Sequence, residues 1–253
     1  MTAQVPYCGS APLPGDLLAR FNFDPALMVS LLLVGAIQLW ALHRSGEPHG
    51  RRSGVFCCAG WLVASAAFIS PLCALSVALF SARILQHMIL VLVAAPLIAM
   101  GLPRSTQDRH PWRLWVAAAA FFLALWYWHM PIPYDDTFVS TPLYWIMHVT
   151  LFGSGILLWR ELLNHPPRWT GQALAAGALT FVHMGLLGAV LTLAERPLFS
   201  WHLTSTQVWG LSPLQDQQLG GSLMWVPGIA FFLWTALRSL SQLWKSLERT
   251  RPA

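Results

Sequence analysis

Charged residues are scarce in this sequence: Asp, Glu, Lys and Arg make up 10% of its 253 residues, whereas a soluble domain has about 25%. A chain with so few charges cannot cover a water-exposed surface, which excludes an ordinary soluble domain. Hydrophobic residues instead make up 56%. A membrane span must be helical, because lipid cannot satisfy free backbone groups, and needs roughly 20 mostly apolar residues. We therefore expect an all-α integral membrane protein.

Motifs of the common catalytic sites are absent as well. The chain has no GxxxxGKS or GxxxxGKT phosphate loop, no GxSxG nucleophile elbow and no HExxH zinc pair. Residues 1–24 lack the basic segment and apolar core of a cleavable signal peptide, so we interpret them as a short N-terminal tail. We accordingly expect a protein that is not an enzyme and has no catalytic residues.

Seven apolar stretches are long enough to be membrane spans. They are residues 25–43, 54–72, 84–101, 114–129, 143–159, 172–193 and 222–240. Residues 73–82 are also apolar but too few to cross alone, so we interpret them as a re-entrant or interfacial link, the alternative being a longer second span. The sequence predicts a seven-transmembrane helix bundle over 25–240, preceded by the tail 1–24 and followed by a basic tail, 241–253.

The Lys and Arg residues predict how the spans are oriented. Most lie in one set of connecting segments: Arg44, Arg51, Arg52, Arg104, Arg109, Arg113, Arg160, Arg168, Arg238, Lys245, Arg249 and Arg251. The other set has only Arg20, Arg83 and Arg196 of the 15. Because cytoplasmic loops are enriched in Lys and Arg, we predict an N-terminus outside the cell and a cytoplasmic C-terminus. The net charge of +5 then reflects the orientation of the spans in the membrane and implies no nucleic-acid partner.

Four of the nine His residues lie inside the predicted spans or at their outer ends. His87, His129 and His148 lie within roughly 10 Å of the outer boundary, at a helical rise of ~1.5 Å per residue, and His183 lies near mid-membrane. For any one of them, a neutral imidazole hydrogen-bonded between helices is the simpler interpretation. Three at one depth on different helices favour a metal site, with His183 as a fourth ligand below.

Sulfur-containing residues accompany these histidines. Each of the four has a Met beside it: Met88, Met130, Met147 and Met184. Thioether and imidazole ligands suit the soft ion Cu(I). However, adjacent helical residues point about 100° apart, so core packing is the preferred interpretation for each Met. Cys8 and Cys73 are both predicted outside, where either a disulfide or a thiolate metal ligand is open.

Polar residues in the predicted outer loops form a second candidate group. They are Tyr134 and Asp135, in the segment WHMPIPYDD, and Asp216, Gln217 and Gln218, in the segment DQQLGG. A carboxylate or amide that orients a metal-bound imidazole is a usual companion of such ligands. The alternative is helix capping by Asp216 and ordinary loop hydrogen bonding.

Several motifs in this order resemble one known family. ISPLCALSVALFSARILQHMILVLVAAPLIAMG (69–101), WHMPIPYDDTF (128–138), the pair Met147-His148 and LSPLQDQQLGGSLMWVPG (211–228) are similar to the CtaG-like family of cytochrome c oxidase assembly factors, named for the caa-type oxidase. The likeness extends from about residue 60 to 230. One position departs from it: where the family usually reads HM-QH, this chain has RILQH, with Arg83 in place of the first histidine.

The resemblance implies a multi-pass assembly factor in a bacterial plasma (inner) membrane. It implies a haem-copper cytochrome c oxidase as partner, copper-centre formation as the role, and an extracytoplasmic copper donor as a further partner. Family motifs map onto His87, His129, Tyr134, Asp135, His148 and Asp216 to Gln218. Two alternatives stay open from the residues themselves: a b-type haem electron carrier, since paired in-span His also ligate haem, and a copper transporter.

Overall fold

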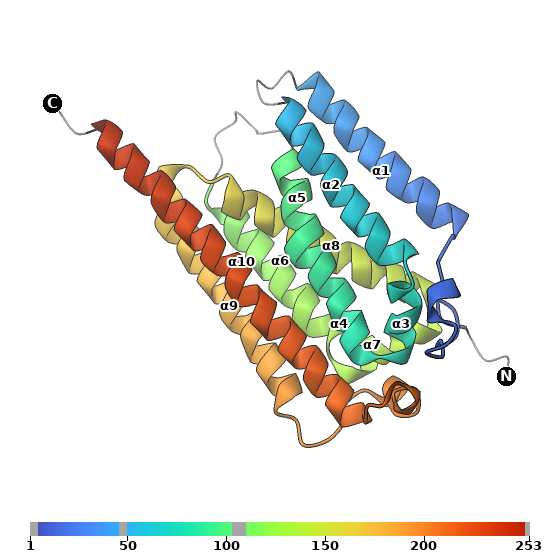
Figure 1. The fold of residues 1–253 in the computed structure, drawn as a ribbon. Helices are drawn as coiled ribbons and strands as arrows, with labels where there is room; N and C mark the ends of the chain where they lie inside the picture. The colour runs from blue at the N-terminus through green and yellow to red at the C-terminus, as the bar shows by residue number, and fades with distance from the viewer. Residues whose placement is uncertain (1–4, 46–49, 103–109, 251–253) are drawn as a thin grey trace.

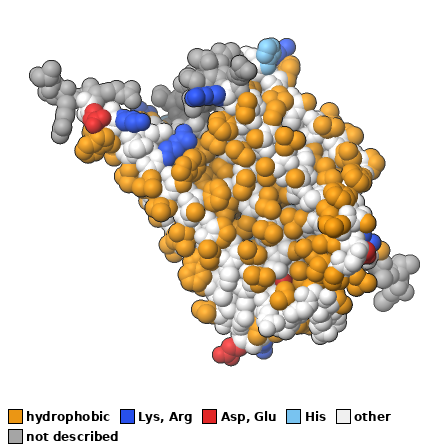
Figure 2. Space-filling view, in the orientation of Figure 1, with side chains coloured by type: hydrophobic (Ala, Val, Ile, Leu, Met, Phe, Trp, Pro, Cys, Tyr) orange, Lys and Arg blue, Asp and Glu red, His pale blue; other side chains and the backbone are white. Residues whose placement is uncertain are grey.

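The computed structural model describes residues 5–45, 50–102 and 110–250, and all regular structure within these ranges is helical. Six helices are long and apolar enough to cross a membrane, and a bent helix pair provides a seventh crossing if it forms one span. Hydrophobic side chains cover the middle of one face, and several Lys and Arg lie near the end where the last helix finishes (Figure 2). The chain is therefore an all-helical, multi-pass membrane protein, as its composition predicts.

The helices surround one central span (Figure 1). The longer ones are α1 (Pro25–Arg44), α2 (Gly50–Ile69), α6 (Trp112–Trp128), α8 (Thr141–Leu163), α9 (Thr170–Thr192) and α10 (Pro213–Thr250). The central span is continuous through α4 (Phe80–Met88), the π-helix η2 (Ile89–Ala94) and α5 (Ala95–Gly101). Shorter helices are α3 (Leu72–Ala78), α7 (Pro131–Val139), η1 (Leu17–Ala19), η3 (Pro167–Trp169), η4 (Ser200–His202) and η5 (Gln207–Trp209). In the most apolar stretch of the central span 72% of the residues are buried, whereas in that of α1, at the edge of the bundle, 17% are buried.

Some boundaries differ from those expected. The apolar segment after span two forms the separate short helix α3, which agrees with a link rather than a longer span. Residues 131–139, expected as loop, form α7 at 75° to α6. Pro131 explains this, because proline fits the first helical turn, where its missing N–H needs no partner. Helix α10 begins at Pro213 rather than 222 and continues to Thr250, through most of the segment expected as a tail.

The π-helical turn in the central span follows from Pro96. In π geometry each N–H bonds the carbonyl five residues earlier, as Ala95 N–H does with Leu90 O. Pro96 has no N–H, so the carbonyl of Val91 loses its partner. The indole Nε1 of Trp159, on α8, donates to that oxygen at 2.7 Å. The π turn begins two residues after His87 and is thus stabilised by a specific side chain from a neighbouring helix.

Close packing of α9 against α10 depends on glycine. The two helices run side by side (Figure 1). A Cβ added at Gly221 would lie 2.7 Å from the carbonyl oxygen of Gly188, a contact that backbone atoms cannot relieve without moving apart. The same addition at Gly153, on α8, meets nothing within 4 Å. Gly221 therefore allows the close helix approach that small residues provide in membranes.

We predict that Gly221→Val destabilises the protein by about 1–3 kcal/mol, because overpacking separates α9 from α10. Gly153→Val is the matched control and should leave stability nearly unchanged. The measurement is thermal unfolding of both variants, purified in the same detergent. Equal stability of the two variants would contradict this packing.

Candidate functional site

Three histidines from different parts of the chain meet inside the bundle. His87 lies near the end of α4, His129 follows the last residue of α6, and His148 lies in the second turn of α8. The ring centroid of His87 is 5.7 Å from that of His129 and 5.3 Å from that of His148, and both pairs meet edge to face. All three side chains are buried. We call these residues the histidine cluster.

Two members of the cluster are held by their own helices. His129 Nδ1 is 2.6 Å from the carbonyl oxygen of Leu125, and His148 Nδ1 is 2.9 Å from that of Tyr144. A carbonyl only accepts, so each Nδ1 carries the proton and each Nε2 presents a lone pair. This arrangement is the one that prepares a neutral imidazole for metal ligation through Nε2.

The remaining ring nitrogens have no partner. Nε2 of His129, Nε2 of His148 and both nitrogens of His87 are buried without a hydrogen bond. Leaving a buried polar atom unpaired costs about 1–3 kcal/mol, so these four nitrogens are the atoms of the cluster that would gain from a partner. Among the residues that the structure describes, no group of three or more His, Cys, Asp or Glu is placed so that it could hold a metal ion. The ring of His87 makes no hydrogen bond that would fix its orientation.

Arg83 lies one helical turn before His87 and is buried, with 1% of its surface exposed. Its Nη1 donates to Thr137 Oγ1 at 2.5 Å, and its guanidinium lies 3.8 Å from the ring centroid of Phe138. The rings of Tyr134 and Tyr144 are also within cation–π range. Among the described residues no carboxylate accepts from this guanidinium, whose Nε has no partner. The cluster therefore has a buried cation beside it, at the position where the chain departs from the family pattern.

The other metal-ligand candidates are not part of this group. His183, on α9, has its ring against Phe121 and Phe122 of α6 rather than against the histidine cluster. The sequence predicts the depth of His183 in the membrane but not the face of α9 on which it lies. In the structure this face is turned towards α6 and not towards the histidine cluster. The Met residues behave as packing: Met88, Met147 and Met184 belong to the hydrophobic core, and Met130 is exposed.

The polar candidates on α10 position helices and loops. The fully buried carboxylate of Asp216 accepts hydrogen bonds from Phe80 N at 2.6 Å and from Ser81 N at 3.1 Å. It thus caps α4 instead of its own helix, and it orients no imidazole directly. Gln217 accepts from Leu198 N at 2.7 Å, and Gln218 donates to Ala194 O at 3.4 Å, so both tie the preceding loop to α10.

Tyr134 and Asp135 bind the loop between α9 and α10. The hydroxyl of Tyr134 is 2.8 Å from Nε2 of His202, and the carboxylate of Asp135 accepts from Ser200 N and Oγ. His202, which the predicted spans leave in the outer loop between the sixth and the seventh, is 2% exposed. Tyr144 lies one helical turn before His148 on α8. This spacing of four residues is the only feature of the sequence that could have identified it.

Cys8 and Cys73 form a disulfide, with their Cα atoms 5.4 Å apart. Of the two interpretations open from the sequence, the disulfide is the one present. It joins the N-terminal tail to α3, and the hydroxyl of Tyr144 lies 3.4 Å from Cys8 Sγ. The tail is therefore held covalently above the cluster.

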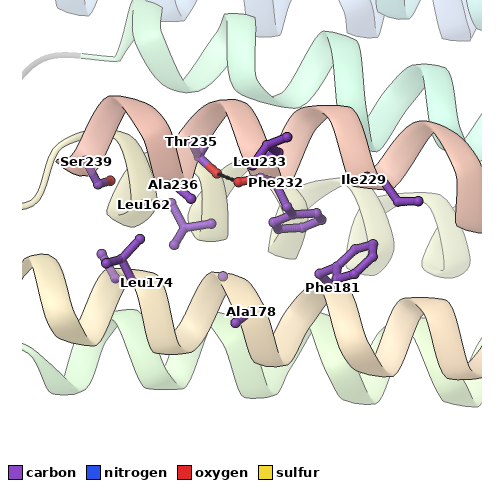
Figure 3. A pocket seen from close by; sticks show the side chains of 12 residues that line it. Leu162, Leu174, Ala178, Phe181, Ile229, Phe232, Leu233, Thr235, Ala236 and Ser239 are labelled. Atoms are coloured by element: carbon purple, nitrogen blue, oxygen red, sulfur yellow. Dashed lines mark hydrogen bonds between the residues drawn. The ribbon is translucent and has the colours of Figure 1, made fainter. Parts of the chain in front are cut away.

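Two apolar grooves differ in their relation to the cluster. One, of about 530 Å³, lies between α1, α2 and α8 and has His148 in its wall. The other, of about 380 Å³, lies between α9 and α10 and is lined by aliphatic and aromatic side chains such as Phe181 and Phe232 (Figure 3). Its few polar groups include Thr235, whose hydroxyl donates to Phe232 O at 2.8 Å. Only the first of these two grooves reaches the cluster.

Burial of His202 gives the fold a dependence on pH. Burial first, and the charge of Arg83 second, lower the pKa of His202 to about 3 from its usual 6.5. In the unfolded chain His202 binds a proton at higher pH than in the folded chain, so stability falls as pH drops from 6.5 towards 3. The largest slope from one such group is about 1 kcal/mol per pH unit.

We predict that His202→Gln removes part of the loss of stability at low pH, because Gln can accept a hydrogen bond from Tyr134 without titrating. Melting temperatures in detergent between pH 7 and 4.5 measure the effect. Identical slopes for His202→Gln and the unaltered protein would show that His202 titrates normally.

Comparison with known proteins places most of the chain in one family. No curated protein and no solved structure matches the chain. The family model described as cytochrome c oxidase caa3 assembly factor (Caa3_CtaG) matches residues 33–246, which include the histidine cluster, Arg83 and Asp216. The chain therefore belongs to the family of cytochrome c oxidase caa3 assembly factors.

Proposed function

We propose that this protein assists copper-centre formation in a haem-copper cytochrome c oxidase by holding Cu(I) at His87, His129 and His148. The N-terminus and the cluster face the extracytoplasmic side of a bacterial plasma membrane. Copper reaches the cluster from a donor on that side and passes to an oxidase subunit beside the bundle. Copper is cargo in this account, and the protein is a chaperone rather than a catalyst.

The observation that carries this proposal is the set of unpaired ring nitrogens in the cluster. Two helices each fix an imidazole with Nε2 as acceptor, and His87 brings two further unpartnered nitrogens between them. Imidazole nitrogens suit copper as they also suit Zn, Fe and Ni, so the nitrogens by themselves define a transition-metal site. The family assigns the oxidase as partner, and copper is the metal that links these nitrogens to that partner.

Arg83 sets the strength of this proposed site. A guanidinium one turn from His87 repels a cation in the cluster, although its aromatic and Thr137 contacts direct it away. This repulsion lowers the affinity below that of three imidazoles alone, which suits a protein that must release its cargo. His183, Met88, Met130, Met147 and Met184 take no part in ligation.

The geometry favours copper over the two alternatives. A bis-imidazole haem needs the iron and the macrocycle between two facing nitrogens, whereas these rings meet edge to face at 5.7 and 5.3 Å. A transporter needs polar groups that continue to the opposite side. The residues that follow His87 in the central span, from Ile89 to Gly101, are apolar instead.

The test is copper retained per chain after anaerobic Cu(I) loading and desalting, measured by elemental mass spectrometry. We predict near-stoichiometric copper for the unaltered protein and a loss of more than about tenfold in affinity for His87→Leu, His129→Leu or His148→Leu, since each removes a ligand. Arg83→His should retain copper more tightly, because it removes the cation and adds an imidazole.

His183→Leu is the matched control, since it removes a buried membrane histidine outside the cluster and should retain copper normally. Loss of copper in His183→Leu equal to that in the cluster variants would contradict the assignment. Stoichiometric iron in place of copper would favour the haem carrier.

A further inference from the structure

The N-terminal tail, residues 5–24, places an aromatic side chain on the outer side of the cluster. The ring of Tyr7 stacks on Tyr144 at 4.8 Å and meets Trp145 edge to face at 5.0 Å. Its hydroxyl donates to the carboxylate of Asp24 at 2.5 Å. Tyr144 in turn lies 4.3 Å from the ring of His148. Tyr7 is thus separated from the cluster by a single aromatic ring.

Tyr7 also lies at one end of the groove that reaches His148. Asp24, Trp145 and His148 all line this groove of about 530 Å³. Tyr7 contacts the first two of these residues directly. The tail therefore packs against the outer end of the groove, where α1 begins, and Tyr7 lies against Tyr144, whose ring contacts the imidazole of His148.

The residue after Tyr7, Cys8, attaches the tail covalently to the bundle. Cys8 is bonded to Cys73, which is fully buried, while Cys8 itself is partly exposed. Besides the aromatic contacts of Tyr7, the tail is joined to the bundle by few hydrogen bonds, such as Asn22 N to Ile69 O and Asn22 Nδ2 to Cys73 Sγ, while Arg20 and Ser10 bond to each other within the tail. The disulfide is therefore the strongest connection that keeps Tyr7 in place.

We propose that the Cys8–Cys73 disulfide is a thiol-exchange site for an extracytoplasmic dithiol, and that its reduction releases Tyr7 and opens the groove to His148. This inference concerns access to the cluster and does not depend on which metal, if any, binds there.

The exchange follows ordinary thiol chemistry. A thiolate of the dithiol attacks Sγ of Cys8, forming a mixed disulfide and expelling the Cys73 thiolate. The second thiol of the reductant then attacks the mixed disulfide, so the reductant leaves as a disulfide and Cys8 and Cys73 each gain a proton. The Asn22 amide, at 3.6 Å, and the Tyr144 hydroxyl, at 3.8 Å, are placed to donate to the leaving Cys73 sulfur.

The test is histidine labelling by diethyl pyrocarbonate in metal-free protein, quantified by peptide mass spectrometry. Protein in detergent is treated or not treated with dithiothreitol, desalted anaerobically and labelled, and its thiols are counted. We predict that reduction raises labelling of His148 several-fold. His43, exposed in the last turn of α1, should label equally in both states, and His183 should stay poorly labelled in both.

Two variants distinguish release of the tail from general unfolding of the protein. Tyr7→Ala keeps the disulfide and should raise His148 labelling without reductant, while Cys8→Ser with Cys73→Ser should label as the reduced protein does. Unchanged His148 labelling after complete reduction would overturn the proposal, and so would a rise at His183 equal to that at His148. The labelling experiment does not measure copper retention. A negative result would therefore contradict the proposed thiol exchange without contradicting the copper proposal, which has a separate test.

Discussion

The carboxylate of Asp216 is the interaction on which the site depends. A helix leaves its first N–H groups without partners, and inside a membrane-embedded bundle there is no bulk water to satisfy them. Asp216, from the first turn of α10, accepts from the first two N–H groups of α4 and from the Ser81 hydroxyl. Its negative charge also suits the positive end of that helix. Because α4 carries Arg83 and His87, this one carboxylate fixes where both enter the bundle interior.

Around that helix the protein buries polar atoms that it does not pair. Buried polar groups are normally hydrogen-bonded, and departures from the rule are expected at functional sites rather than in ordinary cores. Four ring nitrogens of the histidine cluster and Nε of Arg83 lie together, whereas other such atoms, such as Nδ1 of His183 and Nε1 of Trp209, lie apart from them. Part of the stability is therefore given up at the cluster, and the apolar packing of the surrounding helices compensates for it. A ligand that pairs these atoms stabilises the folded protein, which links occupancy to stability.

Much of this architecture was predictable from the sequence, for identifiable reasons. Apolar length finds the spans, and helical rise gives the common depth of His87, His129 and His148. Depth does not give rotation about the helix axis, so His183 looked like a fourth ligand although it faces Phe122. The α4 cap joins residues 136 positions apart, and no local pattern reports such a pair. Residues 131–139 were expected as loop because they lie between two predicted spans, although proline begins helices well.

The central claim is that the three imidazoles of the cluster, and no sulfur, hold Cu(I). X-ray absorption spectroscopy at the copper edge of the Cu(I)-loaded protein tests it most directly, because nitrogen and sulfur neighbours differ in scattering strength and distance. The account predicts a first shell of nitrogen only, with the outer-shell scattering of imidazole rings, that disappears when His129 is replaced by Leu. A sulfur neighbour from Met or Cys, or a nitrogen shell that persists in His129→Leu, would contradict it.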